Sequence, residues 1–351
     1  MASARLATGL AVFVLLISWQ ARGQERPDPT RELTARTYSG LLLEGGNVLA
    51  GTTFGLVLYR LPAPRPSEGE PQPVLVGPEP VVLLPDSVND LFATEGRVYV
   101  ANGPPGIRIV PFNAERTRPL TEGIVEIETA GAALSVAVEG SLLVAALGVM
   151  GVAAWDVSDP TCPAPLFGQD TGGYARHVLV RTEAGENGLP QGLTVFVANG
   201  RKGVARLRLA ADRASVLETG LLESAGDVRR LHLFRDGLLF SRGRQGLCYV
   251  DVTLTPESVA CVPSGDVVRG IAAAGDTVIA ADGGAGLLLV GWSDPQKPGA
   301  PVHFPLGEGS ANRVTVAGDS VIVAADFQGI RVFSLSELQA STSSRPQEEP
   351  R

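Results

Sequence analysis

The chain has 351 residues, with 37 acidic residues against 29 lysines and arginines, so its formal net charge is −8 at neutral pH. Because like charges repel at long range, this balance argues against nucleic acid or an anionic membrane surface as a general partner. The 42 glycines and 26 prolines, within a chain that is 44% hydrophobic, are typical of many short strands separated by turns.

The first 23 residues have the three parts of a secretory signal peptide. Arg5 is a positive start, an apolar run extends from Leu6 to Trp19, and Ala21 and Gly23 are small residues at the −3 and −1 positions of a cut. The run is shorter than the roughly 20 residues that cross a bilayer as a helix. We predict export to the periplasm or the medium with cleavage after Gly23 and no membrane insertion of the mature chain. An uncleaved signal anchor is the alternative.

Seven copies of one pattern occupy residues 24–340. In each copy a glycine precedes an apolar run, and the copies are 40 to 52 residues apart. This spacing of β-type segments is typical of β-propeller blades. The sequence therefore predicts an all-β, seven-bladed β-propeller with four-stranded antiparallel blades and no amphipathic helix. The glycines are Gly55, Gly106, Gly151, Gly203, Gly246, Gly286 and Gly329.

The last copy shows the internal order of a blade and where it is incomplete. A strand over Arg313–Ala317, a turn, a strand over Val321–Ala325 and a third strand over Ile330–Leu335 are followed by no fourth strand. Residues 341–351 are polar and contain proline, which predicts a disordered tail. We expect Glu32–Tyr38, ahead of the first copy, to supply the missing strand and close the ring, because closure protects unpaired strand edges.

These copies resemble the LVIVD-repeat β-propellers of exported bacterial and archaeal proteins over roughly residues 35–336. Only the third and sixth copies keep the Ser-Asp-Pro turn of that family. The resemblance implies a β-propeller, usually of unassigned function. The matching segments are Val98–Ala101, Gly151 with Trp155–Pro160, Cys248–Asp251, and Gly286 with Trp292–Pro295.

The sequence contains no recognisable catalytic motif. Its histidines are His177, His232 and His303, with no H-E-x-x-H pair, and there is neither a phosphate-binding loop nor a G-x-S-x-G elbow. We therefore expect no enzyme activity, no cofactor and no metal. Four polar residues are assigned to the same turn position, where Asn and Asp accept backbone hydrogen bonds and tolerate left-handed backbone: Asn102, Asn199, Asp282 and Asp326.

The cysteines predict one disulfide. Cys248 and Cys261 are expected to face each other on adjacent outer strands of the fifth blade, within disulfide reach. An exported protein meets the oxidising conditions in which such a bond persists. Cys162 is left over, and we expect a buried free thiol there, with an intermolecular link as the alternative.

One group of basic residues has a pattern that the needs of the turns do not explain. Aligned on their first tight turns, the copies place basic residues where the inner strands start, on the face that also carries the turns between second and third strands. Converging guanidinium groups bind carboxylate, sulfate or phosphate through charge-assisted bonds. The predicted binding residues are Arg176, His177, Arg230, His232, Arg269 and Arg313. The alternative is that these arginines pair with acidic residues of the same face: Asp86, Asp90, Asp227, Asp266, Asp282 and Asp326.

The sequence thus favours an exported, non-enzymatic propeller that acts as a binding or protein-interaction scaffold for a protein partner or a small anionic ligand. A metal-dependent, lactonase-like hydrolase or lyase is the alternative and requires several inward carboxylates or amides. A glycan-binding propeller is a third hypothesis, but such sites commonly offer aromatic platforms. Trp155 and Trp292 are expected to be buried in third strands instead.

Overall fold

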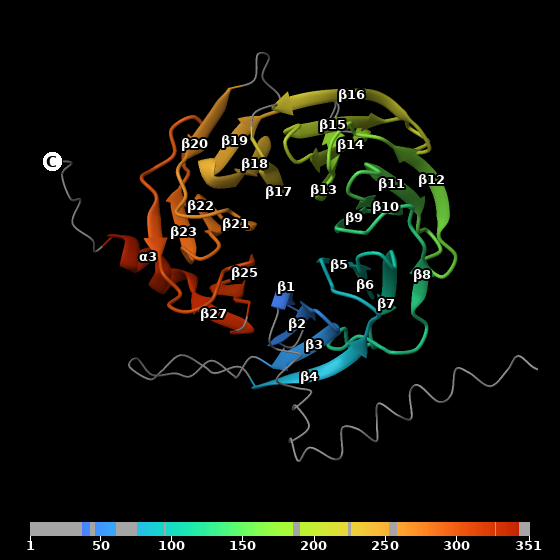
Figure 1. Cartoon of the computed structure of the whole chain (residues 1–351), viewed down its shortest axis with the longest axis horizontal. Helices are drawn as coiled ribbons and strands as arrows, with labels where there is room; N and C mark the ends of the chain where they lie inside the picture. Colours follow the sequence, from blue (N-terminus) through green and yellow to red (C-terminus); the bar gives the residue numbers. More distant parts are fainter. Residues whose placement is uncertain are drawn as a thin grey trace, which may run out of the picture.

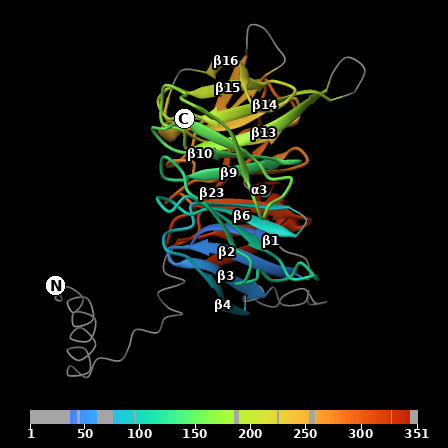
Figure 2. The ribbon, with the colours of Figure 1, turned by 90° about the vertical axis from the view of Figure 1, so that its right-hand side faces the viewer.

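Seven antiparallel sheets surround one axis (Figure 1) in the computed structural model, which describes residues 37–42, 46–60, 76–94, 96–184, 190–223, 226–252, 258–326 and 328–343. The predicted seven-bladed β-propeller is confirmed. Figure 2 shows the same ring from the side. The predicted signal peptide, the proline-rich segment 62–73 and the tail from residue 344 lie outside the described residues.

Each of the first six blades has four strands, and these follow one another in chain order from the axis to the outer edge. The first blade comprises β1 (Thr37–Leu42), β2 (Asn47–Thr52), β3 (Gly55–Arg60) and β4 (Val76–Leu83). The second comprises β5 (Asp90–Thr94), β6 (Arg97–Ala101), β7 (Ile107–Pro111) and β8 (Val125–Ile127). The third comprises β9 (Ser135–Glu139), β10 (Leu142–Ala146), β11 (Val152–Asp156) and β12 (Ala164–Gln169).

The fourth blade comprises β13 (His177–Ala184), β14 (Pro190–Ala198), β15 (Val204–Leu209) and β16 (Val216–Glu223). The fifth comprises β17 (Val228–Phe234), β18 (Gly237–Arg242), the short 3-10 helix η2 (Gly243–Gln245), β19 (Leu247–Asp251) and β20 (Val259–Val262). The sixth comprises β21 (Gly270–Ala274), β22 (Thr277–Ala281), β23 (Leu287–Gly291) and β24 (Val302–Phe304), and the seventh β25 (Arg313–Ala317), β26 (Ser320–Ala324) and β27 (Ile330–Ser334).

Apolar packing between neighbouring blades holds the ring together. The described residues form seven buried clusters, one at each interface between successive blades, including the interface of the first blade with the last. A blade therefore has both faces covered. This explains why a middle strand such as Leu142–Ala146 is buried at every position and has a continuous apolar sequence instead of an alternating one.

The glycine that begins the third strand of each copy has a steric reason. Gly151 has φ +74°, and a Cβ atom there would overlap the carbonyl oxygen of Gln169 on the outer strand β12. Glycine alone combines this left-handed backbone with so close an approach of the neighbouring strand. The same close approach to a carbonyl oxygen of the fourth strand recurs at Gly55, Gly106, Gly246 and Gly286. In these copies the glycine thus marks where the third strand meets the fourth.

The two ends of the propeller differ from expectation. Thr37 and Tyr38 belong to β1, which pairs with β2 as the innermost strand of the first blade, so the prediction that they complete the last blade is wrong. Residues 32–36 lie outside the described residues. In the described chain the last blade has three strands, and apolar contacts between Val57 and Tyr59 of the first blade and Ile322 of the last close the ring.

A helix follows the last strand, although the sequence predicts none. Helix α3 (Leu335–Ser343) extends three residues beyond the predicted start of the tail, and Leu338 is buried in the cluster between the sixth and seventh blades. The Asp319 carboxylate accepts a hydrogen bond from the Ser336 backbone N–H (2.9 Å) in the first turn of this helix. Among the described residues, none forms a helix with the length and hydropathy needed to span a lipid bilayer.

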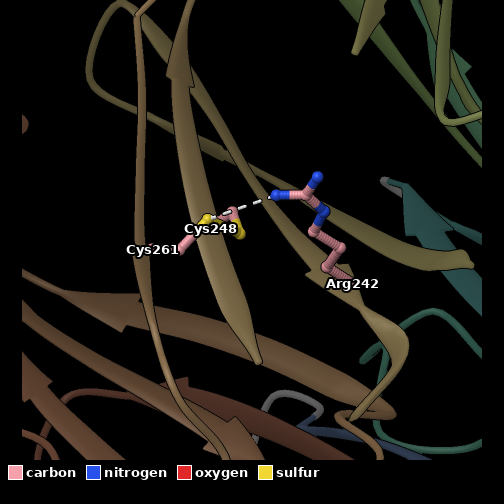
Figure 3. Close-up of a disulfide and its surroundings, with 3 residues drawn as sticks. All are labelled: Arg242, Cys248 and Cys261. Atoms are coloured by element: carbon pink, nitrogen blue, oxygen red, sulfur yellow. Dashed lines mark hydrogen bonds between the residues drawn. A yellow bond between two sulfur atoms is a disulfide. The ribbon is translucent and has the colours of Figure 1, made fainter. Parts of the chain in front are cut away.

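The predicted disulfide is confirmed. Cys248 and Cys261 are directly paired in the register of β19 and β20 and form a disulfide bond, beside which Arg242 donates a hydrogen bond to the Cys261 sulfur (Figure 3). Cys162 is a free thiol, but it is exposed, so the expectation of a buried thiol is wrong. It follows β11 in the turn that begins at Asp159, whose carboxylate accepts the Thr161 N–H, and this turn lies at the surface.

A repeated contact links four pairs of successive blades at the face where the inner strands start. Gly148, in the turn between β10 and β11, has φ +62° and exchanges two backbone hydrogen bonds with Ala175, just before β13. Equivalent bridges join three other pairs of successive blades, namely Gly103 with Ala133, Gly200 with Val228 and Gly283 with Ala311. These contacts place the first residues of the inner strands next to the axis.

Asn and Asp side chains support the same region from within a blade. Asn199 donates from Nδ2 to the Thr171 carbonyl (2.7 Å), and the Asp282 carboxylate accepts the Gly265 N–H (2.7 Å). The predicted acceptor role is therefore correct for Asp282, whereas Asn102 and Asn199 donate from Nδ2 to backbone carbonyls. In these three turns the left-handed residue is the glycine that follows. The prediction for Asp326 is wrong by one position. Ala325 occupies the turn position that Asp282 has in the sixth blade, and Asp326 (φ 51°) occupies the following, left-handed position, which is Gly283 in that blade.

We expect Cys248→Ser with Cys261→Ser to lower the free energy of unfolding by about 3 kcal/mol, since the disulfide limits the entropy of the unfolded chain. Urea denaturation of the oxidised protein and of this double variant measures the difference. Cys162→Ser is the control and leaves the midpoint unchanged because that thiol is exposed and unbonded. Equal stability of all three proteins would contradict the prediction.

Gly151→Ala is expected to destabilise the protein by about 2 kcal/mol or more, because a Cβ atom there adopts a disfavoured φ and meets the β12 backbone. Gly168→Ala on β12 itself is the matched control, since no atom lies within 4 Å of a Cβ built at that position. Thermal denaturation distinguishes the two variants. A Gly151→Ala protein as stable as Gly168→Ala would refute the steric explanation of the repeat.

Candidate functional site

A cavity of about 230 Å³ lies where the inner strands start, and six of the seven blades line it. Each lining residue stands at or near the start of its inner strand. Leu134, Arg176 and Arg229 directly follow residues that bridge to the preceding blade, so these backbone connections shape part of the cavity wall. The lining residues are Asn89, Leu134, Arg176, Arg229, Arg230, Arg269 and Arg313.

One buried carboxylate holds two of the arginines that line this cavity. Asp90, with 11% of its side chain exposed, accepts hydrogen bonds from Arg230 Nη2 (3.3 Å) and Arg313 Nη2 (2.9 Å). Burial raises the pKa of Asp90, while the guanidinium of Arg313 opposes that shift. Removing one partner from such a buried group leaves an uncompensated charge, which is strongly destabilising. Asp90 therefore acts as the anchor of two arginines.

Backbone carbonyl groups occupy further donors of these two arginines. Arg230 Nε and Arg313 Nη1 both donate to the carbonyl oxygen of Arg269 (3.3 Å and 3.1 Å), and Arg313 Nη2 also contacts the Asn89 carbonyl (3.3 Å). Gly270 makes room for them, because a Cβ atom there would lie 2.9 Å from Arg313 Cα. Arg230 and Arg313 are thus largely structural braces, as the alternative of pairing with acidic residues predicted.

The other arginines of the cavity keep donors available to a ligand. Asp227 pairs with Arg229 Nε (2.8 Å) and, more loosely, with Arg176 Nε (3.7 Å). Arg269 is exposed and donates to the neutral Asn312 Oδ1 (2.9 Å), with no carboxylate of the described chain at ion-pair distance. Five guanidinium groups are therefore balanced by only two paired carboxylates. The surplus is concentrated at one small opening of an otherwise acidic protein.

Most other acidic residues of this face bond to backbone N–H groups instead of arginines. Asp86 accepts from Ser87 N, and Asp282 from Gly265 N. The pKa of Asp266 is lowered chiefly by the hydrogen bond from Gly284 N and less strongly by the charges of Arg269 and Arg244. The predicted pairing of arginines with acidic residues is therefore correct for Asp90 and Asp227 but not for Asp86 or Asp282.

The predicted histidines lie deeper along the axis. A second cavity of about 180 Å³ is lined by His177 and His232 with Asp90, Arg230, Arg313 and mainly apolar side chains of the inner strands. Burial lowers the pKa of His232 to about 4 and that of His177 well below 6.5, where the charge of Arg313 adds to the effect. Both histidines are therefore neutral at physiological pH, and His177 Nε2 lies 3.9 Å from the Asp90 carboxylate.

All six predicted residues thus surround the axis, the arginines at the opening and the histidines below it. Arg229 is not among the predicted residues and enters the cavity because β17 contains a bulge between Val228 and Leu231. Two residues there face one on β18, and the backbone N–H groups of Arg229 and Arg230 both donate to Ser241 Oγ. A bulge breaks strand alternation, so periodicity alone did not indicate this residue. Within the described ranges, no three His, Cys, Asp or Glu side chains come close enough together to hold a metal ion.

Comparison with known proteins identifies the fold and no family. No family model and no curated protein matches the chain. The WD40 β-propeller domain of Doa1 superimposes with a TM-score of 0.61 at 12% identity, covering 86% of this chain and 93% of that chain. The β-propeller domain of Cps50 (Swd1) from Myceliophteria thermophila gives 0.59 at 9% identity, covering 86% and 97%.

The extracellular domain of a hybrid two component system from B. thetaiotaomicron gives a TM-score of 0.56 at 11% identity, covering 85% of this chain and 38% of that chain. At these identities the likeness establishes a β-propeller and nothing finer. The similarity to LVIVD-repeat propellers, which no family model supports, remains a resemblance.

The histidine environment predicts a pH dependence of stability. Between pH 6.5 and pH 4 the unfolded chain protonates His232 and the folded protein does not, so stability falls as the pH drops through this range. His232 contributes on the order of 2 kcal/mol to this loss at pH 5. The raised pKa values of Asp90 and Asp282 act in the opposite direction, so a variant is needed to isolate the histidine.

Urea denaturation of the unaltered protein and of His232→Gln at pH 7.5 and pH 5.0 provides the measurement. The variant is expected to lose less stability than the unaltered protein between the two pH values. An identical loss in both proteins would show that His232 is not kept neutral by burial.

Proposed function

We propose that the protein is an exported, non-enzymatic β-propeller that binds an anionic group in its axial arginine-lined cavity. The observation that carries this proposal is the surplus of guanidinium groups around the cavity of about 230 Å³. Among the described residues, its five arginines have only Asp90 and Asp227 as ion-pair partners. Carboxylate, sulfate and phosphate match guanidinium donors in charge and geometry. Export is supported by the Cys248–Cys261 disulfide, which is typical of oxidising compartments.

Within the cavity we assign the ligand contacts to Arg176, Arg269 and Arg229. Arg230 and Arg313 are bonded to Asp90 and to backbone carbonyls, so their role is to hold the wall and supply positive potential. Binding without chemistry is proposed because arginine stays protonated at neutral pH and does not act as a general base. The two histidines that could transfer protons line the deeper cavity in neutral form.

Calorimetric titration with citrate, phosphate and sulfate at low ionic strength tests this assignment. Arg269→Gln and Arg176→Gln are each expected to weaken binding of the tightest of these anions by tenfold or more, since a hydrogen bond to a charged group contributes about 1.5–3 kcal/mol. Raising the salt concentration weakens binding in the unaltered protein because the anion is held by charge.

Arg201→Gln is the matched control. Arg201 lies on the same face in the turn after β14, is exposed and lines neither cavity, so the substitution makes the same charge change outside the site. Its effect on affinity is expected to be less than threefold. If all three variants bind alike, or if none of the anions binds, the axial site is not an anion site.

A further inference from the structure

Two segments near the arginine cavity carry three exposed apolar side chains. Val149 and Met150, in the turn between β10 and β11, are 70% and 49% exposed, and Tyr174, in the loop that leads to β13, is 39% exposed. Large apolar side chains grouped on a surface mark interaction sites more often than isolated ones do. We call Val149, Met150 and Tyr174 the apolar rim.

The apolar rim and the cavity share a residue contact. The Arg176 guanidinium, which lines the cavity, lies 4.7 Å from the centroid of the Tyr174 ring. A Cβ atom at Gly148 would lie 3.2 Å from Tyr174 Cζ, so the turn carrying Val149 and Met150 also packs against the tyrosine. The surface therefore changes from cationic to apolar across one aromatic ring.

The size of the cavity limits what enters it. A volume of about 230 Å³ is below the range of roughly 300–1,000 Å³ that is typical of small-molecule sites. It accommodates a carboxylate-bearing side chain or a chain terminus, whereas a ligand that also contacts the apolar rim must extend out of the cavity across Tyr174. In an extended peptide, side chains two residues apart point the same way and are separated by about 7 Å.

We propose that the ligand is an acidic peptide segment of a partner protein, which inserts a carboxylate among the arginines and places an apolar side chain on the apolar rim. This inference rests on the proposed anion site and specifies its ligand class. Charge complementarity selects the acidic group, and the exposed side chains of Val149 and Met150 select an apolar neighbour within a few residues. Each element alone gives weak binding, and the linkage of both in one chain raises the affinity.

Selection of a random octapeptide display library on the purified protein is the first measurement. We expect the enriched peptides to carry Asp or Glu within three positions of Leu, Met or Phe, and to be displaced by the small anion that binds the cavity. Synthetic versions of these peptides, and versions with Gln in place of Glu, are then titrated by fluorescence anisotropy.

The double variant Val149→Ser with Met150→Gln tests the apolar rim. It is expected to lower the affinity for the selected peptides at least tenfold and to leave the affinity for the small anion within twofold, which also reports that the fold is intact. Leu217→Gln on β16 is the matched control, because Leu217 is equally exposed, at 69%, but lies on an outer strand. Its peptide affinity stays unchanged.

The outcomes separate the two proposals. If an anion binds through Arg269 but the selection yields no acidic peptides, or the peptides ignore the double variant, the ligand is a free small anion and this inference is overturned. If neither anions nor acidic peptides depend on Arg269 and Arg176, the proposed function itself fails.

Discussion

The site depends on a hydrogen-bonded contact between blades, which joins the left-handed turn of one blade to the start of the next inner strand. Gly148 bonds Ala175, and Arg176 is the next residue; Gly200 bonds Val228, and Arg229 is the next residue. Because the contact recurs between four pairs of successive blades, side chains that are far apart in sequence start beside the axis. The fold thereby directs whatever residues follow these contacts toward one cavity.

Several arginines beside one another repel, because their guanidinium groups carry like charges. Asp90 offsets this repulsion for the two most buried arginines. Its buried carboxylate compensates Arg230 and Arg313, whose remaining donors reach carbonyl oxygens. Since charges interact strongly where water is excluded, this arrangement holds both arginines in place. The less buried Arg176 and Arg269 then keep donors that a ligand can use.

The site occupies the part of the propeller that is least constrained by packing. Strands such as Leu142–Ala146 are buried on both faces and must be apolar, whereas a residue at the start of an inner strand faces the channel and contributes little to the clusters between blades. This applies to Arg176 and Arg269, which belong to none of the buried clusters, and not to the paired Asp90 and Arg313. Propellers with 9–12% identity to this chain therefore share its architecture without indicating its ligand.

The sequence by itself determined the seven blades, the Cys248–Cys261 pair and the six residues that gather at the axis, because glycine spacing and strand pairing are recorded locally in each copy. Only the tertiary structure decided which arginines are braces, since Asp90 meets Arg230 and Arg313 across 140 and 223 residues of chain. It also decided that a bulge adds Arg229 and that Cys162 is exposed. Charge pairing across a closed ring depends on the relative placement of several blades, which no single repeat encodes.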